Sequence, residues 1–449
     1  MKRSTDRILT THVGSLPRPQ ALLDMSAARA RGEKGDPATD AALLKKSVAD
    51  VVRKQAQVGL DIVDDGEFSK PSFVTYVRDR LGGLREVGGT RINPWATSRD
   101  AQAFPDFYKK LTTGSVVSRQ PRIGCTMPIT YTGKPHLQTD FDNLKSAMQG
   151  TGVTEAFMPS ISIANIENWN VNQFYKSEDD YLKAVGDAMH VEYKAIVDAG
   201  FLLQIDDPRL ITYYMVEPKA SIEECRRWAE KRVEALNYAL RDIPREKIRY
   251  HTCYSINIGP RVHDMEAKDL LDIILKVKAG AFSFEASNPR HEHEWRLWSE
   301  AKKPADTVLI PGVVTHCSLL VEHPELVAER LIRYAEIVGM ENVIAGTDCG
   351  FASFAAADEI DAGIAWAKLD ALVKGAEIAT KKLKSGRPAK VAVVEKAPAA
   401  VKAPAAAKKE KPAKKVKAPV KAPVKKAAKP VAKKAAKAPA KKAKKSKKR

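Results

Sequence analysis

Apolar residues follow two different spacings along residues 1–386, and each spacing predicts one kind of element. Recurrence at every third or fourth position indicates amphipathic helices, whereas short apolar runs bounded by turn residues indicate buried strands. Helical spacing predicts helices over 40–58, 181–199, 268–277, 324–338 and 362–383. Ser221, with Glu224 three residues further on, predicts a capped helix that runs to about residue 241.

The short apolar runs lie between these helices and define the fold class. They predict strands over 60–63, 122–131, 201–205, 248–254, 282–285, 307–313 and 343–345. Strands that alternate with helices imply an α/β fold with a parallel sheet. About eight such units over roughly 380 residues favour a closed (β/α)8 TIM barrel. A doubly wound open sheet is the alternative, although no GxGxxG or Walker sequence supports it.

Polar side chains at the ends of three predicted strands suggest a metal site. His251 and Cys253 end one strand, Glu285 ends the next, and Cys349 follows a later one. Residues two apart in a strand face the same side, and barrel active sites lie at the carboxyl ends of the strands. Two sulfurs, one imidazole and one carboxylate suit Zn²⁺. The alternative is that these are ordinary buried cysteines and a hydrogen-bonded core histidine.

Charge divides the chain near residue 386. The net charge is +20, but 24 of the 75 basic residues lie in 387–449 beside only two acidic ones, Glu395 and Glu410. This Lys/Ala/Pro-rich segment has no aromatic residue and is expected to be disordered, because it cannot bury enough apolar surface. We therefore expect a barrel over 1–386 and a basic tail over 387–449. The tail either binds polyanions such as nucleic acid, without sequence specificity, or has no dedicated partner.

Cysteine spacing and apolar content indicate the cellular compartment in which the protein is expected. The five cysteines are odd in number and widely spaced, which does not resemble a disulfide framework. The N-terminus lacks the apolar core of a signal peptide, and no run approaches the roughly 20 apolar residues of a membrane span. These features predict a cytoplasmic protein without a membrane partner, and they leave its oligomeric state open.

Several motifs, taken in order, resemble the cobalamin-independent methionine synthase family, in particular its catalytic C-terminal barrel. The resemblance extends to single-barrel members, including epoxyalkane:coenzyme M transferase, and implies a barrel of the methionine synthase/uroporphyrinogen decarboxylase type. The matching motifs are Thr10-Thr11-His12-Val13-Gly14-Ser15, Gly66-Glu67, Gln204-Ile205-Asp206-Asp207-Pro208, His251-x-Cys253, Glu285 and Asp348-Cys349-Gly350.

The resemblance also implies roles for individual residues. His251, Cys253, Glu285 and Cys349 correspond to zinc ligands. The turn around Ser15 corresponds to the one that holds the carboxylate of homocysteine, and Glu67 and Asp206 to the acids that hold its ammonium group. Without the resemblance, Asp206 would more often be read as a turn or cap residue.

The implied activity is zinc-dependent methyl transfer to a thiol, giving methionine from homocysteine. The donor is expected to be 5-methyltetrahydropteroyltriglutamate or another methyl donor. Two alternatives are alkyl transfer to another thiol, as in epoxyalkane:coenzyme M transferase, and a catalytically idle barrel that serves as a scaffold for the basic tail. The resemblance does not extend to the additional N-terminal barrel of full-length methionine synthases or to their tryptophan-containing stretch that stacks on the pterin. Trp169 is expected either to stack on the donor or to serve in packing.

The leaving group of the donor needs a proton, and histidines are candidates to supply it. His316 follows the strand over 307–313 and is the predicted general acid, with His291 and His293 as alternatives. The segment around Arg290 reads either as a loop that offers a cation to an anionic substrate group or as a solvated charged face. His291-x-His293 also raises the alternative of a second metal site.

Overall fold

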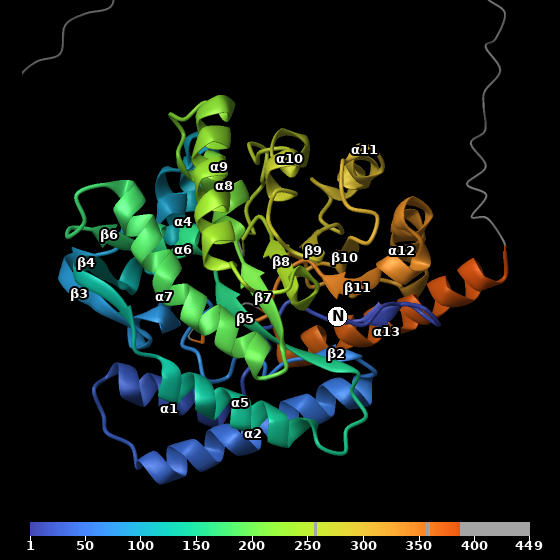
Figure 1. The fold of residues 1–449 in the computed structure, drawn as a ribbon, viewed down its shortest axis with the longest axis horizontal. Helices are drawn as coiled ribbons and strands as arrows, with labels where there is room; N and C mark the ends of the chain where they lie inside the picture. The colour runs from blue at the N-terminus through green and yellow to red at the C-terminus, as the bar shows by residue number, and fades with distance from the viewer. Residues whose placement is uncertain (256–257, 356, 358–359, 387–449) are drawn as a thin grey trace, which may run out of the picture. The chain divides into compact units, whose positions relative to one another are not determined.

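Eight parallel strands form a nearly closed barrel in the computed structural model of the protein, as the sequence predicts (Figure 1). The structure describes residues 1–386 except 256–257, 356 and 358–359. The barrel strands, in the order in which they pair, are β1 (Leu9–Thr10), β11 (Ile344–Thr347), β10 (Val308–Val314), β9 (Ala281–Glu285), β8 (Ile248–Thr252), β7 (Leu202–Asp206), β5 (Glu155–Ile161) and β2 (Ile62–Val63). The two ends of this order meet, because the amide of Asp61 donates to the carbonyl of Thr10 at 3.1 Å.

Side chains alternate between the inside and the outside of the barrel. Arg249 lies in the barrel interior, toward the amino ends of the strands. Its guanidinium is 4.0 Å from the ring centre of Phe157 and donates to the carbonyl of His12 at 2.7 Å. His251 is two residues further along β8 and therefore faces the same interior, nearer the carboxyl end. The register pairs His251 with Ser283 of β9 and with Asp206 of β7. Strand pairing thus gathers the predicted strand-end residues at one mouth of the barrel.

Helices cover the outside of the barrel and bury their apolar faces against it. In Figure 1, α12 and α13 pack together beside β10 and β11, and α2 packs against α5. The helices are α1 (Gln20–Ala30), α2 (Pro37–Val58), α3 (Arg99–Ala103), α4 (Pro105–Thr112), α5 (Lys134–Met148), α6 (Ile163–Trp169), α7 (Glu178–Asp198), α8 (Pro208–Val216), α9 (Ile222–Ala239), α10 (Leu271–Ile274), α11 (Leu297–Glu300), α12 (Pro324–Val338) and α13 (Ala362–Lys384).

Most of the predicted helices are confirmed within a few residues. The capping box at the start of α9 is present, because Ser221 and Glu224 each bond the backbone amide of the other. The prediction over 268–277 was too long, since the α-helix there is only the single turn α10, preceded by a 3-10 turn over Ala267–Asp269.

One predicted barrel strand was wrong. The segment 122–131 forms β4 (Pro121–Tyr131), which lies outside the barrel in a separate sheet with β3 (Leu81–Thr90) and β6 (Asn170–Asn172). It pairs antiparallel with β3, so it belongs to an antiparallel pair and not to a βα unit. Its place in the barrel is taken by β5, and β5 and the two-residue β1 were not predicted.

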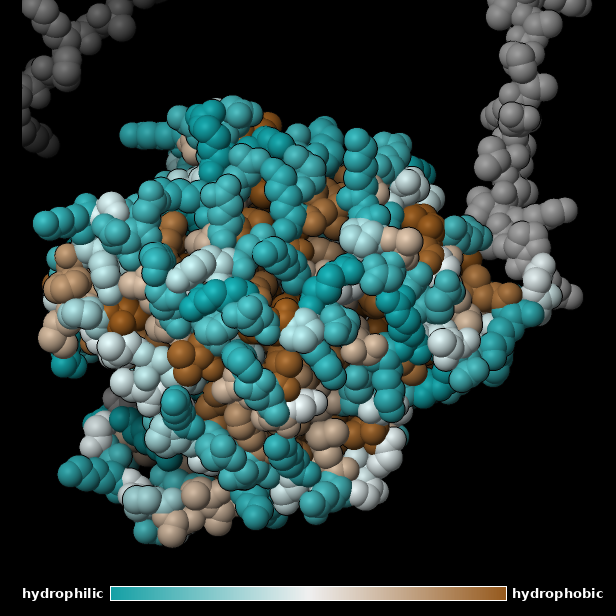
Figure 2. Space-filling view, viewed as in Figure 1, coloured by the Kyte–Doolittle hydropathy of each residue, from teal (hydrophilic) through white to brown (hydrophobic). Residues whose placement is uncertain are grey.

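The predicted basic tail over 387–449 lies outside the described residues. Within the described part of the chain, no helix has the length and apolar character needed to cross a bilayer. Hydrophilic side chains dominate the face seen in Figure 2, with hydrophobic ones showing between them.

Candidate metal and substrate site

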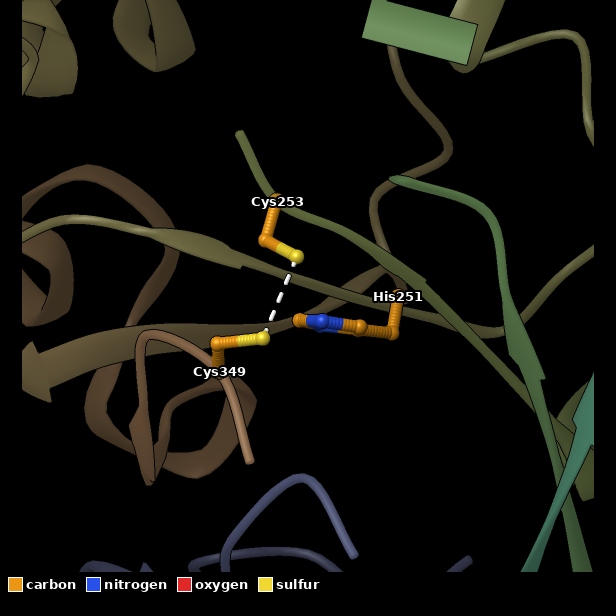
Figure 3. Close-up of side chains that lie close together, drawn as sticks. All are labelled: His251, Cys253 and Cys349. Carbon is orange, nitrogen blue, oxygen red and sulfur yellow. Dashed lines mark hydrogen bonds between the residues drawn. The ribbon is translucent and has the colours of Figure 1, made fainter. Parts of the chain in front are cut away.

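Three of the four predicted metal ligands converge at the carboxyl ends of the barrel strands. His251 and Cys253 come from β8 and its end, and Cys349 follows β11. One ligand atom of each lies within 4.8 Å of the others, and the two sulfurs are 3.3 Å apart (Figure 3). All three side chains are buried. Residues almost a hundred positions apart in the chain therefore meet because β8 and β11 belong to one barrel.

The surroundings of His251 prepare its ring to coordinate a metal. Its Nδ1 lies 3.2 Å from the hydroxyl of Ser283, which faces the same interior from β9. Its Nε2 is buried and has no hydrogen-bond partner among the described residues. Burial, with the nearby charge of Arg249, lowers the pKa of His251 to about 3, so the imidazole is neutral at physiological pH. A neutral ring with one nitrogen held and the other free is the usual state of a metal-ligating histidine.

This donor set fits zinc. Each Zn–S bond is about 2.3 Å, so two thiolates on one tetrahedral zinc stand about 3.8 Å apart, close to the separation of Cys253 and Cys349. None of the five cysteines is in a disulfide. A buried, unpartnered imidazole nitrogen would be costly without a ligand to satisfy it. Three protein ligands would leave one position for a substrate, as in catalytic zinc sites.

Glu285, the predicted fourth ligand, is not part of this three-residue group. Its carboxylate accepts from the amide of Tyr254 at 2.7 Å and from Asn288 at 3.0 Å, and it pairs with Arg261 at 3.1 Å. Burial opposes ionisation, but the Arg261 charge, together with His316 and the hydrogen bond from Asn288, holds the pKa of Glu285 below its usual value. Glu285 is therefore an ionised carboxylate at the barrel mouth, engaged by an arginine that the sequence did not single out.

A small hollow joins the metal-binding group to all three predicted substrate-binding residues, Ser15, Glu67 and Asp206. It lies inside the carboxyl ends of the strands. Its lining consists of Val13, Ser15, Glu67, Phe73, Asp206, Pro208, His251, Cys253, Ser255, Cys349, Gly350 and Ser353.

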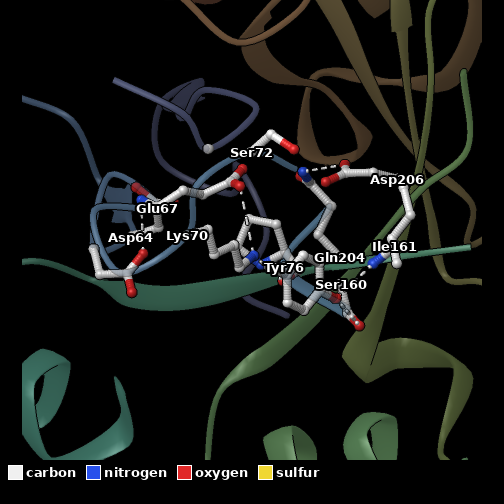
Figure 4. A network of polar contacts seen from close by, with 12 residues as sticks. Asp64, Glu67, Lys70, Ser72, Tyr76, Ser160, Ile161, Gln204 and Asp206 are labelled. Carbon is white, nitrogen blue, oxygen red and sulfur yellow. Dashed lines mark hydrogen bonds and ion pairs between the residues drawn. The ribbon is translucent and has the colours of Figure 1, made fainter. Parts of the chain in front are cut away.

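Two buried carboxylates face this hollow. Gln204 donates to Asp206 at 2.7 Å, and Lys70 pairs with Glu67 at 3.5 Å (Figure 4). Burial and the neighbouring charge of Glu67 raise the pKa of Asp206 well above its usual value. The Oε2 atom of Glu67 forms this ion pair but accepts no hydrogen bond among the described residues. Two buried acids that share a single lysine can accommodate a ligand that brings a further positive charge.

The loop after β1 approaches the site so closely that it requires glycine. Gly14 has φ +136°, and a Cβ there would stand 2.7 Å from Oε1 of Glu67. A Cβ on Gly350 would overlap the hydroxyl of Ser15. Glu67 itself has φ 58°, a left-handed conformation that is uncommon for residues other than glycine and that concentrates at functional sites.

The predicted general acid, His316, lies beside the site but does not line the hollow. Its Nε2 is 3.3 Å from the carbonyl of Ser255, which does line it, and 3.3 Å from the sulfur of Cys317. Burial lowers the pKa of His316 to about 4, with Glu285 opposing this effect, so the ring is uncharged at neutral pH. Its role as proton donor stays a prediction.

The segment around Arg290 lies away from the hollow. His291 is buried between Asp264 at 3.1 Å and Glu294 at 3.2 Å, and these acids hold its pKa at about 9 despite the burial. His293 and Arg290 are exposed, and Arg290 donates to the carbonyl of Val262 at 3.2 Å. Among the described residues, neither His291 nor His293 belongs to a group that could hold a metal.

Sequence reasoning missed several residues that shape the site. Ser283 orients His251, Arg261 binds Glu285, and Lys70 pairs with Glu67. Strand alternation could have found Ser283, because it is two residues before Glu285 on the same face of its strand. Arg261 follows a strand end within a long loop, where no spacing rule applies.

The fold and the site together define a class: α/β-barrel proteins in which a His/Cys group that could hold a metal lies beside an acidic pocket at the carboxyl ends of the strands. Within this class, the chain belongs to the cobalamin-independent methionine synthase family, since the family described as "Cobalamin-independent synthase, Catalytic domain" matches residues 8–103 and 163–368.

Relatives of similar length support this membership. The methionine synthase of Thermococcus kodakarensis is 25% identical over 375 residues, which cover 83% of this chain and 94% of that protein. The methionine synthase of Sulfurisphaera tokodaii is 26% identical over 379 residues, covering 84% and 94%.

Solved structures share the fold. A B12-independent methionine synthase from Shewanella sp. W3-18-1, in complex with selenomethionine, superposes with a TM-score of 0.65 at 18% identity, covering 84% of this chain and 99% of that one. A putative vitamin-B12 independent methionine synthase from Listeria monocytogenes gives a TM-score of 0.58 at 19% identity, covering 83% and 98%.

Proposed function

We propose that this protein is a zinc-dependent S-methyltransferase that converts homocysteine to methionine. One observation carries the proposal: His251, Cys253 and Cys349 meet in the same hollow as Glu67 and Asp206. This arrangement offers one position to a thiol and another to an ammonium group a few bonds away, which is the pattern of a small amino acid with a sulfur end. The relatives that match most of the chain are named methionine synthases.

The protein's contribution to the reaction is to hold and orient. A free thiol has a pKa near 8.5 and is mostly protonated at neutral pH. Bound by His251, Cys253 and Cys349, a zinc ion would supply the charge that ionises the acceptor thiol. Glu67 and Asp206 would hold the ammonium group, and the loop through Ser15 the carboxylate, so that the sulfur faces the His/Cys group. Glu285 stays a predicted fourth ligand, whose place the acceptor thiol would take.

The transfer itself is a displacement at carbon. The thiolate supplies the electron pair of the new S–C bond, and the bond from the methyl carbon to a donor nitrogen or oxygen breaks. That donor atom keeps the electron pair and takes up a proton. His316 is the proposed source, which requires that substrate binding raise its low pKa so that the ring carries a proton.

The acid pair argues against one alternative, and the unpartnered His251 nitrogen against the other. A sulfonate thiol such as coenzyme M would meet two buried carboxylates with its own negative charge, which is unfavourable. An idle scaffold would have no use for an imidazole nitrogen that is buried and unpartnered. Homocysteine methylation therefore accounts for more of the site than either alternative.

The test combines bound metal with turnover. Purified protein should contain about one zinc per chain and methylate homocysteine when pteroyl, corrinoid and epoxide donors are assayed in parallel. Cys253→Ser and Cys349→Ser should each lose both zinc and activity, whereas Cys225→Ser, a buried cysteine of α9, should keep both. Full zinc and full turnover in either site variant would show that the ligand assignment is wrong.

A further inference from the structure

Two polar side chains support the loop after β1 from inside the barrel. Gln204 of β7 and Arg249 of β8 are register partners, and both are fully buried. Gln204 donates to the carbonyl of Val13. Arg249 donates to the carbonyl of His12 at 2.7 Å and to the hydroxyl of Thr11 at 3.0 Å. The oxygens of this loop are therefore held by the barrel interior.

The same loop leaves hydrogen-bond donors available at the hollow. The backbone N–H groups of Val13 and Ser15, and the hydroxyl of Ser15, donate to no other group among the described residues. Both residues line the hollow. Unpaired N–H groups in a buried turn suit an anionic group. This geometry agrees with the carboxylate-binding role proposed for the loop.

The amide of Gln204 also holds the acid proposed to bind the ammonium group. Its Nε2 donates to Oδ1 of Asp206 at 2.7 Å as well as to the carbonyl of Val13 (Figure 4). Both partners are acceptors, so the amide must turn its NH2 toward them and its oxygen away. That Oε1 is buried and has no hydrogen-bond partner within the described part of the chain. A buried unsatisfied oxygen is uncommon in native proteins and calls for an explanation.

The shape of an α-amino acid supplies that explanation. Its ammonium and carboxylate groups stand on one carbon, so the distance between them is fixed. A site that binds both must hold its two halves at a matching distance, to within about 0.5 Å. Here the halves come from Val13 and Asp206, which lie on opposite sides of the described chain, and one planar amide bonds to both.

We propose that Gln204 is a positioning residue that holds the carboxylate-binding loop and the ammonium-binding Asp206 at the separation of an α-amino acid. Gln204 does not line the hollow and acts through Val13 and Asp206. The site therefore selects ligands that carry both groups on one carbon over ligands that carry only one of them. The inference rests on the proposed function for homocysteine as the ligand, but not for the coupling of the two subsites.

The test measures binding of three probes to the full-length protein by calorimetry. L-methionine carries both groups, 4-(methylthio)butanoate lacks the ammonium group, and 3-(methylthio)propylamine lacks the carboxylate. Gln204→Met keeps the size of the side chain and removes both hydrogen bonds. It should weaken binding of L-methionine by about tenfold or more. Each single-group probe should lose clearly less affinity, because it can follow its own subsite when the two subsites separate.

Gln204→Asn is a second variant, because its amide is one methylene shorter and cannot reach both oxygens. It should also lose affinity mainly for L-methionine, and it decides the question if Gln204→Met does not fold. Ser160→Ala is the matched control. Ser160 lies on the neighbouring strand β5 and donates to Glu192 of α7 at 2.7 Å, outside the barrel. This control should lower the melting temperature and leave all three affinities unchanged.

Turnover gives an independent measure of the same role. In Gln204→Met, the KM for homocysteine should rise while kcat and bound zinc stay near their wild-type values. Equal loss of affinity for all three probes would reduce Gln204 to a general packing role and overturn the proposal. An unchanged affinity for L-methionine, or a loss that one single-group probe matches in full, would overturn it as well.

This outcome is distinguishable from that of the proposed function, because probe binding needs no methyl donor. A selective loss of L-methionine affinity in a protein that never methylates homocysteine would uphold the coupling and reject the methyltransferase. Methylation with an unchanged KM for homocysteine in Gln204→Met would do the reverse.

Discussion

Burial sets the protonation state of His12, which lies beneath the predicted substrate loop. Its Nε2 is 2.8 Å from Oε1 of Gln55, and its Nδ1 accepts from the amide of Gly14 at 3.2 Å. One nitrogen donates and the other accepts, so the ring is bound in its neutral form. Burial lowers its pKa from 6.5 to about 4. His12 thus orders the turn at Gly14 only while it is uncharged.

His12→Asn should change how stability depends on pH. Because the folded pKa is lowered, the stabilising effect of His12 is fully present above pH 6.5 and is lost as the pH falls toward 4. The free energy of unfolding of the wild type should fall relative to the variant by up to about 3 kcal/mol over this range. Urea unfolding at several pH values measures it. His136→Asn, at an exposed position of α5, is the control. Parallel pH curves for wild type and His12→Asn would contradict this interpretation.

Gly14→Ala should weaken homocysteine binding while leaving the metal in place. A Cβ at this position would press on Oε1 of Glu67 and on Pro159, which displaces the carboxylate proposed to hold the ammonium group. The KM for homocysteine should rise by about tenfold or more, with zinc content unchanged. Gly200→Ala separates the backbone cost from the crowding, because Gly200 also has a positive φ but no atom lies within 4 Å of its added Cβ. A Gly14→Ala protein with wild-type KM would remove Glu67 from the binding site.

Among the elements, α9 shows how local sequence fixes a boundary. Ser221 accepts from the amide of Glu224, and the carboxylate of Glu224 accepts from the amide of Ser221 at 2.8 Å. This capping box was readable from four residues of sequence, because it depends only on local backbone geometry.

Ser221→Ala should lower the free energy of unfolding by about 1 kcal/mol, because it removes one half of the box. Glu224→Gln should cost less, since a glutamine side chain still accepts the Ser221 amide. Equilibrium denaturation of both variants checks the order. A larger loss in Glu224→Gln would mean that the charge at the helix N-terminus matters more than the hydrogen bonds.

Other elements could not be assigned from the sequence. A short apolar run identified 122–131 as a strand, but such a run does not say which sheet a strand joins. Only the antiparallel pairing with β3 places it outside the barrel. The barrel strand β1 has two residues, too few for any periodicity.

The site was more predictable, because His251, Cys253 and Cys349 all follow from strand ends. The Arg261 partner of Glu285 was not, because long loops bring residues together without a fixed spacing.

At the scale of the whole molecule, charge separates two parts of the chain. The sequence predicts a barrel over 1–386 and a basic tail over 387–449. The first part contains the complete site and carries nearly balanced charge, whereas the basic excess lies in 387–449. We propose that catalysis belongs to the first part and polyanion binding to the second.

Truncation after Gly386 should leave homocysteine methylation intact and abolish retention on DNA at low salt. Retention of the full chain should fall steeply as salt rises, because it depends on counterion release. Chromatography of both proteins on a DNA column over a salt gradient measures the difference. Equal retention of the truncated protein would show that the tail is not the binding element.

The central claim is that a metal held by one imidazole and two thiolates ionises the sulfur of homocysteine. X-ray absorption at the zinc edge, recorded on the full-length protein with and without homocysteine, tests this most directly. We expect two sulfur neighbours at about 2.3 Å in the protein alone and three when homocysteine is present. A zinc coordination shell without sulfur, or one whose sulfur number homocysteine leaves unchanged, would contradict this claim.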